Sequence, residues 1–210
     1  MNYLTHLSFF VGASVLLSVP VAGAEGLDAL ASAVAKYESG ADLAPQRQFE
    51  QLLRESAGDP GRRSECEAAL IRLLAPETTF EAKRFACNNL AVYGSDAALP
   101  ALASLLKQDD TVGLACFALG RFPSTKAGDL LRAALTDERA QVRLQLIVSL
   151  GLRAEPESVK PLVGLARDVD SNIARAAIRA LGAIDAVSAS EALAELRRDA
   201  VSGVAADDVA

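Results

Sequence analysis

A short helical phrase that ends in glycine occurs four times along the chain. Its glycines are Gly94, Gly120, Gly151 and Gly182, separated by 26, 31 and 31 residues. The residues one and four positions before each glycine are cysteine or large and apolar, which is the spacing of one face of an α-helix. A helical unit of this length cannot bury its apolar face alone, so consecutive units must stack. The repeat therefore constrains the chain to an array of helices.

A second set of helices is expected between these phrases. Leucine and valine recur at helical spacing through 96–110, 126–138 and 156–168. Each unit is then a first helix, a turn and a second helix that ends at the repeated glycine. Because glycine after a helix commonly adopts a positive φ, we expect the four glycines to end the second helices in that conformation. The predicted fold class is all-α, an α-solenoid.

The N-terminal residues have the pattern of an export signal. Residues 7–19 are mostly apolar, and the small residues Ala22 and Ala24 predict a cleavage site after Ala24. No Lys or Arg precedes the apolar stretch, so an uncleaved membrane anchor is the alternative. The predicted location is the periplasm. The predicted organisation is a signal peptide over 1–24, N-terminal helices or a cap over 25–61, a repeat array over 62–201 with about four helix pairs and one extra helix, and a flexible acidic tail over 202–210.

The repeats resemble a known family. The phrases "VRLQLIVSLG" and "IARAAIRALG", each after an aspartate-containing turn, are similar to HEAT repeats, in detail to the bacterial HEAT-like repeats of the phycobilisome-lyase type. The segment "KRFACNNLAVYGSDAALPALASLL" also resembles exported HEAT-repeat proteins. The resemblance covers about 62–200 and implies a right-handed superhelix of helical hairpins that binds other proteins. Arg143 matches the family's arginine, but the other repeats lack it, so an Asp–Arg ladder between repeats is expected to be incomplete.

Composition and charge disfavour several classes of activity. The only histidine, His6, lies in the predicted signal, so the mature chain would have no imidazole for a catalytic triad or a His-ligated metal. The formal net charge of -6 at pH 7 argues against nucleic acid or an anionic membrane surface as a partner. We therefore expect no catalytic residue, no metal and no cofactor.

The second helices contain a candidate partner-binding surface. Positions seven and three residues before each repeated glycine are expected to face solvent, yet the middle two repeats hold large apolar residues there. Two arginines one turn apart could pair with a partner's carboxylates at one end, and an asparagine could hydrogen-bond at the other. Plain packing against a neighbouring helix is the alternative. The candidate partner-binding residues are Asn88, Phe117, Leu144, Val148, Arg175 and Arg179.

The three cysteines are Cys66, Cys87 and Cys116. Cys66 and Cys87 lie at equal distances from the turn around Pro76, at the same height on antiparallel helices, so a disulfide between them is conceivable. Neighbouring helix axes often leave such Cα atoms too far apart for the bond. Cys116 lies on the apolar face of its helix and is expected to be a small buried residue.

The leading functional interpretation is an exported, non-enzymatic scaffold or adaptor that binds another protein or a peptide. One alternative is a lyase-like or chaperone-like auxiliary protein, which the name of the similar repeats suggests. The other alternative is a structural module of a larger protein or a self-associating spacer, since the helix over 188–200 has no following partner helix in the sequence.

Overall fold

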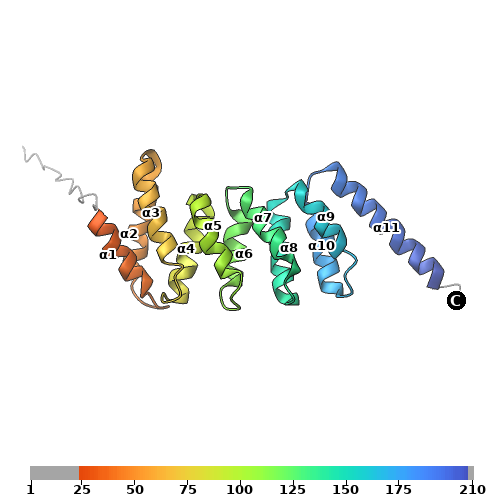
Figure 1. Ribbon diagram of the computed structural model, residues 1–210, viewed down its shortest axis with the longest axis horizontal. Coiled ribbons are helices and arrows are strands. Elements are labelled where there is room, and N and C mark those ends of the chain that lie inside the picture. Colours follow the sequence, from red (N-terminus) through yellow and green to blue (C-terminus); the bar gives the residue numbers. More distant parts are fainter. Residues whose placement is uncertain (1–23, 208–210) are drawn as a thin grey trace, which may run out of the picture.

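The structure is a computed structural model that describes residues 24–207, and these residues form an elongated stack of helices (Figure 1). The helices are α1 (Ala24–Ala35), α2 (Ala44–Glu55), α3 (Pro60–Arg72), α4 (Phe80–Tyr93), α5 (Leu99–Leu105), α6 (Val112–Arg121), α7 (Lys126–Ala133), α8 (Ala140–Arg153), α9 (Val159–Leu165), α10 (Ser171–Ala183) and α11 (Val187–Asp207). Short 3-10 helices follow α2 and α7 and precede α5 and α9. The fold is an all-α solenoid. The predicted signal peptide lies outside the described residues except for Ala24.

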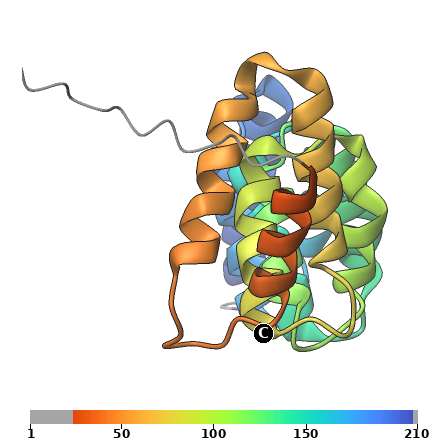
Figure 2. The same cartoon turned by 90° about the vertical axis from the view of Figure 1, so that its left-hand side faces the viewer.

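The helices of the repeats form two rows. The second-helix row consists of α4, α6, α8 and α10, each packed against the next, and the first-helix row contributes α5 on α6, α7 on α8 and α9 on α10. Viewed along the stack, the successive units superimpose behind α1 and α2 (Figure 2). The apolar residues that recur at helical spacing lie between the rows, where Leu90, Ile147 and Leu181 are fully buried. Each unit therefore buries its apolar faces against its neighbours.

The repeated glycines do not end their helices as expected. Gly120, Gly151 and Gly182 lie inside α6, α8 and α10, and Gly94 follows α4 with φ -69. Among the described residues only Gly40 and Ala154 have a positive φ. Two of them allow close helix packing instead: a Cβ on Gly120 would lie 3.2 Å from the Cβ of Ser149, and a Cβ on Gly151 would lie 3.1 Å from the Cα of Ala180, each in the next second helix. A Cβ on Gly182 would meet nothing within 4 Å. The positive-φ prediction is therefore wrong.

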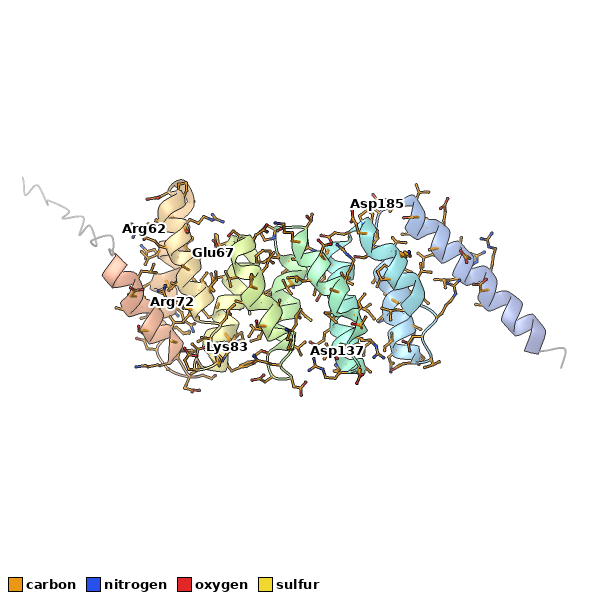
Figure 3. The ribbon with its side chains drawn as sticks, in the orientation of Figure 1. Arg62, Glu67, Arg72, Lys83, Asp137 and Asp185 are labelled. Atoms are coloured by element: carbon orange, nitrogen blue, oxygen red, sulfur yellow. The ribbon has the colours of Figure 1, made fainter. Side chains whose placement is uncertain are left out.

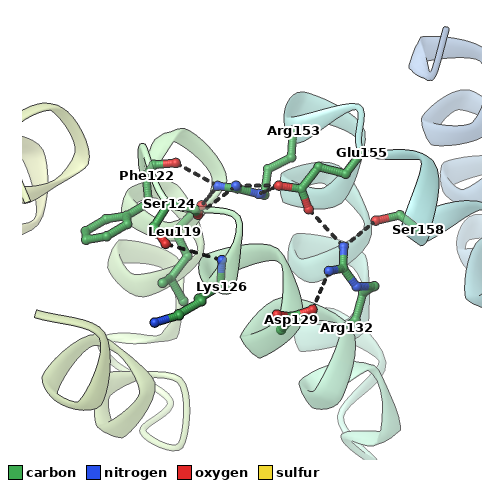
Figure 4. Close-up of polar contacts among 9 residues, drawn as sticks. All are labelled: Leu119, Phe122, Ser124, Lys126, Asp129, Arg132, Arg153, Glu155 and Ser158. Atoms are coloured by element: carbon green, nitrogen blue, oxygen red, sulfur yellow. Dashed lines mark hydrogen bonds and ion pairs between the residues drawn. The ribbon is translucent and has the colours of Figure 1, made fainter. Parts of the chain in front are cut away.

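A buried arginine joins two successive units. The side chain of Arg153, near the end of α8, is 6% exposed and pairs with Glu155. Glu155 in turn accepts a hydrogen bond from Arg132 of α7 at 2.8 Å (Figure 4). The guanidinium of Arg153 also donates, at 2.8–2.9 Å, to three carbonyl oxygens at and after the end of α6, those of Leu119, Phe122 and Ser124. Since those carbonyls have few other partners at a helix end, Arg153 both caps α6 and fixes α8 beside it.

The Asp–Arg contact between repeats is made by a different arginine from the one expected. Arg139, which precedes α8, pairs with Asp109 of the previous unit and with Asp137 of its own turn. Hydrogen bonds from Arg139 lower the pKa of Asp137 to about 2. Arg143, which matches the family pattern, donates to the backbone carbonyls of Asp137 and Glu138, and so it holds its own turn.

Earlier units are joined by other polar contacts. The carboxylate of Glu67 in α3, labelled in Figure 3, accepts a 2.6 Å hydrogen bond from the backbone N–H of Ser95. At the start of α4, the Thr79 hydroxyl donates to the carbonyl of Tyr37 after α1 at 2.6 Å. The rings of Phe49 in α2 and Phe85 in α4 meet edge to face with centroids 5.7 Å apart. The N-terminal helices are thus packed onto the first repeat.

The last helix, α11, packs on α9 and α10 and extends past them (Figure 1). Arg167, after α9, pairs with Glu195 and Asp199 of α11 at 3.2 and 2.8 Å. The helix continues to Asp207, so the flexible tail predicted from residue 202 is helical as far as the structure describes it. Alanines at 205 and 206 favour helix and no proline interrupts the segment. No helix in 24–207 has the length and apolarity needed to cross a membrane.

Candidate partner-binding groove

A groove with a volume of about 360 Å³ runs between α6 and α8. Apolar side chains of the two helices form most of its walls. The lining residues are Gly113, Cys116, Phe117, Arg121, Gln141, Leu144, Gln145, Val148, Ser149 and Leu152.

Three apolar residues predicted from the repeat register meet in this groove. Phe117 is 40% exposed and Val148 is 58% exposed, while Leu144 between them is half-buried. The structure therefore brings together Phe117, Leu144 and Val148 as one open apolar surface.

Leu152 belongs to the same surface, although sequence reasoning did not select it. Its side chain is 56% exposed and lies one turn beyond Val148 along α8. The residue follows Gly151, which was expected to end the helix, so its position on the helical face was not considered. The i, i+4 spacing from Val148 was the signal that could have identified it.

A cation lies over the aromatic wall of the groove. The guanidinium carbon of Arg121 is 4.2 Å from the centroid of the Phe117 ring. This distance permits a cation–π contact, and the two residues are one turn apart on α6. Arg121 makes no ion pair with any described residue. Its charge therefore stands at the rim of an apolar surface without a carboxylate partner.

Two polar side chains of α8 form part of the floor. The Ser149 hydroxyl donates to the carbonyl oxygen of Cys116 at 2.9 Å and so fixes α8 against α6. The Oε1 atom of Gln145 is buried beside Gly113 and accepts no hydrogen bond from the described residues. An unpaired buried acceptor costs free energy, so the groove has one position that would gain from a hydrogen-bond donor.

The other predicted partner-binding residues lie outside the groove. Arg175 and Arg179 are exposed on α10, at the register of Leu144 and Val148 one unit earlier. Asn88 is exposed on α4 and does not line the groove. In α4 the residues at the two solvent-facing positions of the register, Cys87 and Ala91, are buried. Helices α1 and α2 contact α4 in addition to its repeat neighbours.

All three cysteines are free and buried. The conceivable Cys66–Cys87 disulfide is not formed, in keeping with the separation usual between neighbouring helix axes. Burial raises the pKa of the Cys87 and Cys116 thiols to about 12. Such thiols stay protonated at neutral pH and are poor nucleophiles. Cys116 is buried, as its position on the apolar face predicts.

Nothing in the groove indicates bond-making chemistry. Within 24–207 there is no group of three or more His, Cys, Asp or Glu side chains that could hold a metal ion. The groove lining contains no carboxylate and no histidine, and its one thiol is buried with a raised pKa. What the arrangement can do chemically is bury apolar side chains of a ligand and attract negative charge.

Comparison with known proteins identifies part of the array. The family model for HEAT repeats matches residues 128–209, which include α8 and therefore one wall of the groove. A search of curated proteins found no match. The match supports the general resemblance to HEAT repeats and leaves the similarity to the phycobilisome-lyase type as a prediction.

Proposed function

Because residues 128–209 match the family model for HEAT repeats, we propose that the protein is an exported, non-enzymatic scaffold that binds another protein or a peptide in the groove between α6 and α8. HEAT repeats generally mediate protein–protein interaction. The observation that carries the proposal is the open apolar surface of Phe117, Val148 and Leu152. Large apolar side chains that share one groove on a folded surface are typical of an interaction site.

A ligand that covers this surface would gain a substantial free energy of binding. Full burial of a Phe, Val or Leu side chain stabilises by roughly 1.5–3 kcal/mol relative to full exposure. The three residues are about half exposed, so covering them would contribute roughly 1 kcal/mol each. A ligand that also fills the rest of the groove would gain further apolar contact. This contribution suits a partner that inserts several apolar side chains.

The groove can be tested by capture from an envelope extract of the source organism. The bait is the mature chain 25–210, compared with the variant Phe117→Asp/Val148→Asp. The matched control is Val169→Asp, since Val169 is fully exposed in the turn between α9 and α10 and lies outside the groove. Circular dichroism establishes that all three baits are folded.

The proposal expects one protein to be retained by the parent and by the Val169→Asp control but lost with Phe117→Asp/Val148→Asp. A photo-crosslinking residue at position 152 should then link that protein covalently to the groove. If the double variant retains the same proteins as the parent, the groove does not bind them and the proposal is overturned.

Export is the part of the proposal that rests on sequence alone. It is supported by the apolar stretch over 7–19 and by the small residues before Glu25. Fusion of residues 1–30 to alkaline phosphatase, which is active only outside the bacterial cytoplasm, tests it. Activity together with an N-terminus at Glu25 is the expected result, and an inactive fusion would overturn it.

A structural module is the second candidate function, because one feature of α10 favours it. Ile178 is 41% exposed, whereas its equivalent one unit earlier, Ile147, is fully buried. An open end of this kind suits a stack that continues onto another polypeptide. Light scattering over a range of concentrations measures self-association. A monomer at all concentrations would reject the self-associating form of this candidate.

A further inference from the structure

The second helices that form and flank the groove contain no acidic residue. Helices α6, α8 and α10 include neither Asp nor Glu, although the chain has 27 such residues and a net charge of -6. They include three exposed arginines without a carboxylate partner among the described residues: Arg121, Arg175 and Arg179. The charge of this surface is therefore opposite to that of the whole chain.

Several arginines elsewhere in the array behave differently. Six of them pair with carboxylates within the described residues: Arg72, Arg84, Arg132, Arg139, Arg153 and Arg167. On the groove side, Arg121 instead lies over a phenyl ring, and Arg175 bonds to the neutral oxygens of Ser171 and Asn172. Arg47 and Arg54 of α2 likewise make no ion pair with a described residue, so unpaired arginines are not confined to the groove. The three beside the groove differ in that they lie on helices without any acidic residue.

The positions of these arginines place positive charge on both sides of the apolar surface. Arg121 stands on the α6 side, at the end of the groove near Leu152. Arg175 and Arg179 belong to α10, which packs along the opposite side of α8. The groove lies between these two groups of cations.

The hydrogen-bonding groups of the groove also determine which backbone conformation a ligand can adopt there. Its walls offer one buried unpaired acceptor, Gln145 Oε1, and no row of free backbone groups, because α6 and α8 satisfy their own. An extended peptide lying there would bury backbone N–H and C=O groups without partners. A helical ligand satisfies its backbone internally and presents only side chains. The groove also runs lengthwise along two helices, which suits apolar residues at helical spacing.

We infer that the ligand is an acidic amphipathic helix, whose apolar face enters the groove of Phe117, Val148 and Leu152 and whose carboxylates pair with Arg121 on one side and with Arg175 and Arg179 on the other. This inference rests on the proposed function and names the chemistry of its partner. Charge-assisted pairs at the rim would orient the helix and speed its association, while the apolar contacts provide most of the affinity.

The test is fluorescence anisotropy of the mature full chain with three labelled helical peptides of about five turns, roughly 18 residues. All three carry the same leucines at every third and fourth position. The flanking positions hold Glu in the first peptide, Gln in the second and Lys in the third. We expect the Glu peptide to bind about tenfold more tightly than the Gln peptide, and the Lys peptide to bind most weakly. The advantage of the Glu peptide should shrink as NaCl is raised.

Two variants locate the charge effect. Arg175→Glu/Arg179→Glu should abolish the preference for Glu over Gln and improve binding of the Lys peptide. The matched control, Arg47→Glu/Arg54→Glu, makes the same charge change on exposed positions of α2 and should keep the preference. Phe117→Asp/Val148→Asp should weaken binding of all three peptides.

The outcomes separate the inference from the proposed function. If the Glu and Gln peptides bind equally well, and both lose binding in Phe117→Asp/Val148→Asp, the acidic ligand is wrong while the groove still binds apolar helices. If the control on α2 removes the preference as fully as the variant on α10, the effect is one of net charge and the inference is also overturned. If no peptide binds the parent chain, the inference and the role of the groove fail together.

Discussion

The junction between α8 and α10 and the open face of α10 contain the same residue types at the same register but differ in what lies against them. At the junction Ile147 is fully buried, and a Cβ on Gly151 would meet Ala180 at 3.1 Å. On the face of α10, Ile178 is 41% exposed and a Cβ on Gly182 would meet nothing within 4 Å. The difference is the next second helix, which is present in one case and absent from the described residues in the other.

This comparison shows that the role of a repeated residue is set by its neighbour. Isoleucine and glycine stabilise the stack only where a following helix packs on them, as expected for an array whose stability is a sum over neighbouring units. The polar contacts also differ between the inside of the stack and its end. Arg153 is buried at the junction of α6 and α8, whereas Arg167 is exposed beside α11. Matched substitutions at the two places can therefore measure what each neighbour contributes.

The largest effect is expected for the arginines. Arg153→Ala would remove the guanidinium donor of three carbonyls at the end of α6 and leave Glu155 with Arg132 as its remaining cation, which should cost about 3–5 kcal/mol of unfolding free energy. Arg167→Ala removes an exposed pair and should cost about 0–1 kcal/mol. Urea denaturation followed by circular dichroism measures both.

The variant Arg153→Lys serves as a control for charge. Lysine keeps the positive charge but cannot direct several N–H groups at Glu155 and the carbonyls together, so we expect it to recover only part of the loss. Equal costs for Arg153→Ala and Arg167→Ala would show that the junction is no more dependent on its arginine than the end of the array.

Much of the fold follows from the sequence, because helical spacing and repeat length are local properties that a stack must preserve. The exposed surface of Phe117, Leu144 and Val148 was also predictable, since register alone places it. The roles of glycine and of Arg153 were not, because both depend on contacts with a unit about 30 residues away. Glycine after an apolar residue has the same local signature in a helix end and in a close helix crossing. The uneven pairing of arginines likewise requires three-dimensional neighbours.

The second comparison uses the two isoleucines. Ile147→Ala should cost about 2–4 kcal/mol, because it removes buried methyl groups and leaves a cavity between α8 and its neighbours. Ile178→Ala should cost less than about 1 kcal/mol in the monomer, since its side chain is already partly hydrated. Denaturation at low protein concentration is the measurement. A cost for Ile178→Ala that rises with protein concentration would indicate that another copy covers α10.

The third comparison uses the glycines and predicts opposite signs. Gly151→Ala should destabilise by about 1–3 kcal/mol, because the added methyl group would press on the backbone of α10 at Ala180. Gly182→Ala has open space and replaces the poorest ordinary helix former with the best, so it should stabilise by up to about 1 kcal/mol. Thermal and urea unfolding of the two variants measure the difference. A loss of stability in Gly182→Ala would mean that α10 is covered in solution.

The smallest effect concerns pH and the carboxylate at the α6–α8 junction. Burial raises the pKa of Glu155, but hydrogen bonds and charge from Arg153 and Arg132 outweigh it and lower the pKa overall. A lowered pKa stabilises the folded state above the unfolded value of about 4.3, and this stabilisation is lost as pH falls through the folded value. Glu155→Gln, which cannot ionise, should therefore cost about 1–2 kcal/mol at pH 7 and less at pH 3. Glu195→Gln, at an exposed pair beside α11, should change stability little at either pH. Urea titrations of the parent and both variants at the two pH values measure these differences. An equal cost of Glu155→Gln at pH 7 and pH 3 would show that the charge of Glu155 does not stabilise the junction.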